Sequence, residues 1–261
     1  MTIQEIIQTI EAVAPRPLQE SYDNSGIQVG DITTSAEAAL LCIDITEAVI
    51  DEAIALGVNL VISHHPLIFQ GIKSLTGKNY IERVIIKALK HDICLYSAHT
   101  NLDNALWGVN FEIANKLNLK NVEILDQKQN TTLIAGSGVT GILDEPMEYM
   151  DFLHLLKKTF KCGCIQYSQP LGKKISKVAV CGGSAAFLIP QAIQSEADIY
   201  VTGEIKYHDY FGNDEQIMLA NIGHYESEQF TIDLIASIIR EKYPTFEVYF
   251  TKVNTNPINY L

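Results

Sequence analysis

Two adjacent histidines, His64 and His65, follow an apolar run and precede Pro66 in the stretch VISHHPLIF (61–69). The apolar run has the length and composition of a buried strand, and ligands of parallel α/β sheets bind outside the carboxyl ends of the strands. Successive side chains on extended backbone point to opposite sides, and a following proline favours extended backbone. We therefore expect the two imidazoles to reach two neighbouring metal ions. A hydrogen-bonded or solvated imidazole is the alternative for each.

A second group of polar residues follows the next apolar run, ICLYSA (93–98). The letters HTNLDN place His99 and Asp103 just beyond this predicted strand. Aspartate is a favoured N-cap residue, so the alternative role of Asp103 is to cap a helix expected from residue 104.

A third group follows the apolar run QIMLANIG (216–223), which also ends in a turn. His224 and Glu228 stand four residues apart, so a helix that begins at this turn brings both side chains to one face. Glu226 then points elsewhere, and we interpret it as facing solvent.

Three predicted strand ends together supply four imidazoles and two carboxylates: His64, His65, His99, Asp103, His224 and Glu228. Zinc, manganese and iron favour such ligands, and carboxylates bridge two cations about 3.5–4 Å apart in two-metal hydrolytic sites. Each group alone has a structural alternative, but the combination predicts a site for divalent metal ions.

Strands and helices alternate in the first half of the chain. Three apolar runs occupy residues 39–46, 58–63 and 93–98. Each is followed by a segment of helical periodicity, at 47–57, 80–92 and 104–119 respectively. Such alternation predicts an α/β fold with a parallel-rich sheet covered by helices on both faces.

The pattern changes after residue 125, where polar and glycine-rich β-like segments replace it. We expect two lobes, each with a sheet flanked by helices. The first comprises 1–125 plus 223–261 and carries most of the metal ligands, and the second, 126–222, covers the cleft. The apolar run 216–223, the helix after it and the strand 247–252 are expected to return to the first sheet.

The composition of the chain disfavours some classes of binding partner. The chain has 261 residues with a formal net charge of −12, which disfavours broad binding to nucleic acid or anionic lipid. No apolar run reaches the roughly 18 residues that span a bilayer. The five cysteines are odd in number and scattered, which is typical of reduced thiols in a cytoplasmic protein.

Several motifs occur in a fixed order: YDNSGIQVGD, SHHPLIF, SAHTNLDN, VAVCGGS, ADIYVTGEIKYHDYF and GHYESE. Together they resemble the dinuclear-metal-centre proteins of the GTP cyclohydrolase 1 type 2 homologue family, also called the NIF-three-like family. The similarity covers essentially the whole chain, and SHHP and GHxxxE are its most specific elements.

The resemblance implies a toroidal homohexamer with two divalent ions per subunit in the cleft between the lobes. It implies His64, His65, Asp103, His224 and Glu228 as the metal ligands, with both carboxylates bridging. His99 is implied to line the same pocket, as a general acid or base or as an occasional metal ligand. We favour proton transfer, because an imidazole titrates near neutral pH. Lys206 and His208 are implied to face the cleft, where they are candidates for phosphate contacts.

The leading functional hypothesis is metal-dependent hydrolysis. In the reaction that the family name implies, activated water attacks C8 of the guanine ring of GTP, and formate is released. Two alternatives stay open: hydrolysis of a phosphoester or another nucleotide by the same ions, and a non-catalytic metal-binding regulatory or scaffold protein. The CGGSAA turn is a candidate anion site, although a glycine pair is more often only a turn.

Overall fold

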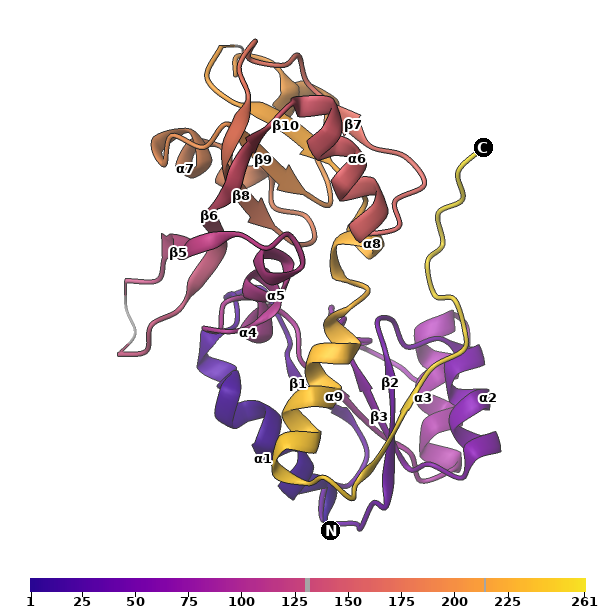
Figure 1. Ribbon diagram of the computed structural model, residues 1–261. Helices are drawn as coiled ribbons and strands as arrows, with labels where there is room; N and C mark the ends of the chain where they lie inside the picture. Colours follow the sequence, from indigo (N-terminus) through magenta and orange to yellow (C-terminus); the bar gives the residue numbers. More distant parts are fainter. Residues whose placement is uncertain (130–131, 214) are drawn as a thin grey trace. The chain divides into compact units, whose positions relative to one another are not determined.

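Each of two units of the chain is built around one β-sheet (Figure 1). Unit 1 comprises Met1–Leu102 and Phe230–Pro257, and unit 2 comprises Asp103–Gln229 and Ile258–Leu261. The computed structural model describes residues 1–129, 132–213 and 215–261. Among these residues, no helix is long and apolar enough to cross a bilayer.

The sheet of unit 1 is mostly parallel, as the alternation of strands and helices predicts. Its strands run in the order β1-β4-β3-β2-β11. They are β1 (Gly26–Val29), β2 (Ala38–Cys42), β3 (Leu60–Ser63), β4 (Cys94–Ser97) and β11 (Glu247–Phe250). The strands from β4 to β11 are parallel, and only β1 pairs antiparallel, with β4. All four residues of β3 are buried, as expected for a strand covered on both faces.

Helices cover both faces of this sheet. They are α1 (Ile3–Val13), α2 (Glu47–Leu56), α3 (Tyr80–Lys90) and α9 (Thr231–Lys242), with a short 3₁₀ turn, η1 (Arg16–Leu18). Figure 1 shows α2 and α3 together on one side of β2 and β3, and α9, which is distant in sequence, beside α1 on the other. Thr46 caps α2, and Gly57 ends it with a left-handed φ of 69°.

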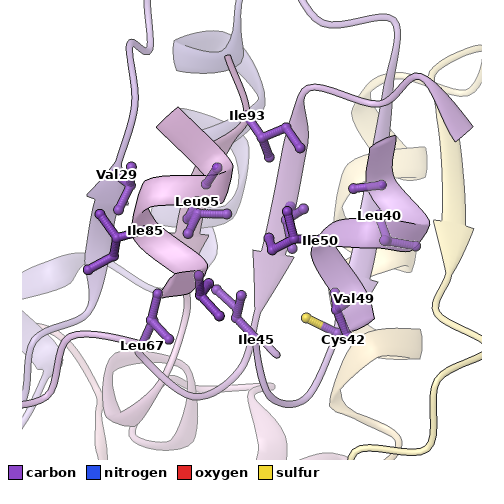
Figure 2. Close-up of a cluster of buried hydrophobic side chains, with 14 of the residues drawn as sticks. Val29, Leu40, Cys42, Ile45, Val49, Ile50, Leu67, Ile85, Ile93 and Leu95 are labelled. Atoms are coloured by element: carbon purple, nitrogen blue, oxygen red, sulfur yellow. The ribbon is translucent and has the colours of Figure 1, made fainter. Parts of the chain in front are cut away.

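One hydrophobic core lies between the sheet and the α2–α3 pair (Figure 2). α2 contributes Val49 and Ile50, α3 contributes Ile85, and the strands contribute Leu40 and Leu95. Burial of each such side chain favours the folded state by about 1.5–3 kcal/mol. This packed layer fixes the strand ends from which His64, His65 and His99 project.

The sheet of unit 2 is mixed. Its order is β5-β6-β8-β9-β10-β7. The strands are β5 (Lys120–Gln127), β6 (Gly136–Met147), β7 (Gln166–Tyr167), β8 (Ile175–Cys181), β9 (Ile199–Thr202) and β10 (Met218–Asn221). β8, β9 and β10 are parallel, whereas β5, β6 and β7 pair antiparallel with their neighbours.

The helices between Thr100 and Glu228 are 4 to 11 residues long. They are α4 (Thr100–Asp103), α5 (Val109–Lys116), α6 (Tyr149–Thr159), α7 (Ile189–Gln194) and α8 (His224–Glu228), with 3₁₀ turns η2 (Ala186–Leu188) and η3 (Tyr207–Tyr210). α4 spans the boundary between the two units. The expected fold class, α/β with two helix-flanked sheets, is confirmed.

The division into units differs from the expected lobes. β5 pairs with β6, and α5 packs against β6 and β8, so residues 103–125 lie in unit 2. The prediction that 216–223 returns to the first sheet is wrong, because β10 pairs with β9. Unit 2 therefore carries three of the five expected metal ligands, Asp103, His224 and Glu228.

Candidate metal centre

His64 and His65 continue directly from the carboxyl end of β3. Their backbone N–H groups donate to the carbonyl oxygens of Cys42 and Ile43 at 3.2 and 2.9 Å, which extends the pairing with β2. The Ser63 hydroxyl donates to the His65 carbonyl oxygen at 2.7 Å. The backbone that carries both imidazoles is therefore held by the sheet rather than by a free loop.

His99 joins this pair from the end of β4, the parallel neighbour of β3. The ring centroids of His64 and His65 lie 4.9 Å apart, and His99 lies 5.3 and 5.4 Å from them. One ring nitrogen of each histidine lies within 4.8 Å of the other two. Unit 1 thus gathers three imidazoles at adjacent strand ends, as expected.

The Nδ1 atom of each of the first two imidazoles meets a hydrogen-bond acceptor. His64 Nδ1 lies 2.9 Å from the carbonyl oxygen of Ala98, and His65 Nδ1 lies 2.8 Å from Asp44 Oδ1. A carbonyl or carboxylate oxygen only accepts, so in the neutral ring Nδ1 carries the proton and Nε2 keeps the lone pair. Metal-binding histidines typically have this arrangement.

His99 has the same arrangement, with Asp23 as the acceptor at 2.7 Å. Asp23 also accepts from the Thr100 and Ser25 hydroxyls. Burial raises the pKa of Asp23, but the hydrogen bond and charge of His99 and the two hydroxyls outweigh it and hold that pKa well below its usual range. Asp23 therefore stays ionised and orients the His99 ring.

In unit 2, the i,i+4 spacing brings His224 and Glu228 together on α8, as predicted. His224 Nδ1 lies 2.8 Å from Glu204 Oε1, and His224 Nε2 lies 3.1 Å from Glu228 Oε2. With its proton on Nδ1, the neutral imidazole presents a lone pair to a carboxylate. The Nε2 lone pair and the Glu228 carboxylate are both acceptors, so their contact is stable only when a positive charge lies between them. A second proton on the imidazole or a metal ion would supply that charge.

Asp103 lies near Glu228 in the same unit. One carboxylate oxygen of each lies within 4.8 Å of the other, and burial together with the charges of Asp103 and Glu228 raises the pKa of the Cys181 thiol. The alternative that Asp103 caps a following helix is wrong, because α4 ends at Asp103 and α5 begins after Gly108. Two neighbouring carboxylates form a cation site more readily than an anion site.

The glycine turn after β8 makes room for Glu228. Gly183 has φ +65°, and a Cβ added there would lie 2.4 Å from Glu228 Oε1. The N–H groups of Gly182 and Gly183 donate to Asn110 Oδ1 and Ser227 Oγ at 2.9 and 3.0 Å. Because both N–H groups are used within the protein, the turn supports the metal-ligand helix and does not offer them to an anion.

Glu226 does not face solvent, contrary to the expectation. It is buried beside Tyr260 of the C-terminal segment, and burial together with the charge and hydrogen bond of Glu226 raises the pKa of Tyr260 to about 12. Lys206 and His208 are exposed at η3.

Sequence reasoning missed the acceptors Asp23, Asp44 and Glu204. They lie 76, 21 and 20 residues from the histidines that they orient. Asp23 belongs to the motif YDNSGIQVGD, which contributed to the family resemblance but was assigned no role in the site. No local periodicity marks any of the three.

Comparison with known proteins agrees with these motifs. A family model described as Duf34/NIF3 (NGG1p interacting factor 3) matches residues 1–257. The chain belongs to the Duf34/NIF3 family. The expected resemblance is thereby confirmed.

Duf34/NIF3 relatives from several bacteria match over nearly their full length. A Lactococcus lactis protein is 32% identical, with 98% of each chain covered, and a Clostridium perfringens protein is 34% identical, with 93% of this chain and 92% of the relative covered. Both are named GTP cyclohydrolase 1 type 2 homolog.

Solved structures have the same fold. A hypothetical protein from Staphylococcus aureus superposes with a TM-score of 0.92 at 29% identity, with 100% of this chain and 99% of that chain covered. Reduced HcgD from Methanocaldococcus jannaschii superposes with a TM-score of 0.80 at 28% identity, with 97% and 98% covered.

Proposed function

We propose that this Duf34/NIF3 protein is a metal-dependent hydrolase that holds two divalent ions per chain with ligands from both units. His64 and His65 would come from unit 1, and Asp103, His224 and Glu228 from unit 2, with the two carboxylates bridging. The observation that carries the proposal is the orientation of the imidazoles. Each has Nδ1 directed at a carbonyl or carboxylate oxygen, so in the neutral ring Nε2 carries the lone pair that a cation would bind.

The donor set fits borderline divalent metals. Imidazole and carboxylate together suit zinc, manganese or iron, whereas calcium and magnesium favour oxygen ligands alone. Bound ions of this kind lower the pKa of a coordinated water towards neutrality.

His99 is the group that we assign to proton transfer. Its Nε2 would take a proton from the attacking water or give one to the leaving nitrogen. Asp23 holds the ring in one tautomer and stabilises the imidazolium, as the aspartate of a catalytic triad does. The relatives' name points to GTP as the substrate. Addition of one water at C8 of guanine would open the imidazole ring to a formamide, and hydrolysis of that formamide by a second water would release formate.

A reloading experiment tests this function. Protein stripped with a chelator is reloaded with zinc, manganese or iron and incubated with GTP, and formate and phosphate are measured in the same samples. We expect formate well above the level of His64→Ala, and an unchanged rate in His154→Ala, which alters an exposed histidine on α6. Phosphate without formate would favour the phosphoester alternative. Neither product from metal-loaded protein would favour a non-catalytic regulatory or scaffold role.

We also infer that the protein forms a homohexamer, as the motif resemblance implies. Light scattering after size-exclusion chromatography would then give six times the 29.0 kDa chain mass. A monomer across the micromolar range would rule out this assembly. Dissociation on chelation would show that the ions also support the assembly.

A further inference from the structure

A pocket of about 490 Å³ in unit 2 is lined by three tyrosines, a glutamine and an isoleucine: Gln166, Tyr167, Ile205, Tyr207 and Tyr210. Its volume falls within the range of small-molecule sites, about 300–1,000 Å³. None of these five side chains carries a charge at neutral pH. The lining therefore suits a neutral, planar, partly apolar group better than a phosphate.

The pocket lies where parallel strands end. β9 ends three residues before Ile205, and β10 ends at Asn221, which pairs in register with Gln166 of β7. β9 and β10 are parallel, and ligands of such sheets bind outside the carboxyl ends of the strands. Two observations, the cavity and the strand ends, therefore indicate the same position.

An exposed aromatic ring is available at this pocket. The Tyr207 side chain is 72% exposed, and Tyr167 is 46% exposed. Phe211 packs against Tyr207 with ring centroids 5.2 Å apart and an interplanar angle of 68°, an edge-to-face contact. This contact braces the Tyr207 ring and leaves much of its surface uncovered, as in the aromatic platforms on which nucleobases stack.

Amide and hydroxyl groups stand beside these rings. Asn221 Nδ2 donates to Gln166 Oε1 at 3.2 Å, which holds the Gln166 amide at the rim. The Tyr210 oxygen is buried, and no partner within the described residues reaches it at full hydrogen-bond geometry. The Asn221 amide only partly offsets the burial that raises the pKa of Tyr210. The Gln166 amide can pair with the hydrogen-bonding edge of a heterocycle.

The pocket shares two segments with the metal-ligand helix. Asn221 Oδ1 accepts from the N–H of Gly223, directly before His224. Glu204, which orients His224, directly precedes the pocket residue Ile205. A ligand in the pocket would therefore lie against the same segments that position α8.

We propose that this tyrosine pocket binds the base of a nucleotide, with the ring stacked on Tyr207 and its edge hydrogen-bonded to Gln166. The identity of the base as a purine rests on the proposed function, whereas binding of a nucleobase-like ring does not. The pocket thus supplies base recognition, a role that the metal ligands themselves cannot perform.

Calorimetric titration of chelator-treated protein with guanosine tests the proposal without metal, phosphate or turnover. We expect saturable binding that Tyr207→Ala weakens at least fivefold, the lower end of the loss of one base–aromatic stack. Tyr207→Phe should restore binding to within twofold. Tyr80→Ala, which removes a 54% exposed tyrosine from α3 of unit 1, should leave it unchanged. Circular dichroism of each variant would establish that the fold is retained.

Absence of guanosine binding to the wild type would overturn the proposal, as would equal affinity in Tyr207→Ala or equally tight binding of ribose 5-phosphate. The outcome is separable from that of the proposed function. Guanosine binding without formate release would support the nucleobase pocket and contradict the proposed hydrolase activity. Formate release with an unchanged KM in Tyr207→Ala would support the hydrolase activity and contradict base recognition by this pocket.

Discussion

At the scale of single residues, the acceptor that orients Nδ1 differs among the four histidines. His64 uses a backbone carbonyl oxygen, whereas His65, His99 and His224 each use a carboxylate. A carboxylate raises the basicity of the opposite nitrogen more than a carbonyl does, because it stabilises positive charge on the ring. Substitution of these carboxylates should therefore change the metal affinity of the site without removing any ligand.

Glu204→Gln should weaken zinc binding about 10- to 100-fold, the usual effect of losing such a partner. The amide keeps the size of the side chain but loses the charge that holds the His224 proton on Nδ1. Competition against a chelating dye measures the affinity. Glu145→Gln, which alters an exposed glutamate on β6, is the matched control. Equal zinc affinity in both variants would mean that Glu204 does not support His224.

His99→Asn should lower formate release about 10²- to 10⁴-fold, the usual contribution of a general acid or base. The asparagine removes the imidazole that we assign to proton transfer, while the expected metal ligands remain. Elemental analysis should therefore find the same metal content as in the wild type. A parallel loss of metal and activity would instead identify His99 as a ligand.

At the scale of elements, the turn after β8 is coupled to α8. Gly183 adopts φ +65°, and its Cβ position is occupied by the Glu228 carboxylate. Gly172 has a similar φ of +71°, with nothing within 4 Å of the corresponding position. The two glycines therefore separate the cost of backbone strain from the cost of displacing Glu228.

Gly183→Ala and Gly172→Ala should each destabilise the fold by about 1–2 kcal/mol, because an L-residue is strained at positive φ. Only Gly183→Ala should also weaken metal binding, because the new methyl group displaces Glu228. Urea unfolding of metal-free protein and zinc titration measure the two effects separately. Equal zinc affinities would show that Glu228 tolerates the displacement.

The segment before α3 depends on a buried carboxylate. Hydrogen bonds from the Thr76 backbone and hydroxyl and from the Lys78 backbone, opposed by burial, lower the pKa of Glu82 to about 2. The folded state therefore holds the Glu82 proton less tightly than the unfolded state does. The resulting stabilisation is complete above pH 4.5 and is lost as the pH falls towards 2.

Glu82→Gln should therefore unfold at a lower temperature than the wild type at pH 7, and the gap should narrow between pH 4.5 and 2. The neutral amide has no charge to lose over this range. Thermal melts at intervals of half a pH unit would measure the gap. A gap that stays constant down to pH 2 would contradict the assigned pKa.

Sequence patterns predicted some elements well and others poorly, for a physical reason. The apolar runs at 58–63 and 93–98 contain β3 and β4, and helical periodicity at 80–92 contains α3, because these patterns reflect burial within one element. The run at 216–223 is a strand, but its sheet was assigned wrongly. An apolar strand fits any buried sheet, and only its partner, β9, decides which.

The candidate site was likewise predictable only in part. His224 and Glu228 lie four residues apart on one helix, so the sequence alone predicts that their side chains meet. The pairing of His99 with Asp23 spans 76 residues and forms only when β4 and the segment before β1 come together. The tyrosine pocket likewise joins β7 to the segment between β9 and β10.

At the scale of the whole molecule, the two units carry different ligand types. Unit 1 presents three imidazoles, and unit 2 presents one imidazole with two carboxylates. Neither unit alone has the five ligands that we assign to two ions. The central proposal therefore requires that substitutions in either unit affect the same ions.

Elemental analysis of metal bound per chain tests this most directly. Wild type, His65→Ala in unit 1, Glu228→Gln in unit 2 and the surface control His154→Ala would be loaded identically and desalted. We expect two equivalents of metal in the wild type and in His154→Ala, and at most one in each of the other two. Two equivalents retained by His65→Ala or Glu228→Gln, or no metal on the wild type, would contradict a centre shared by both units.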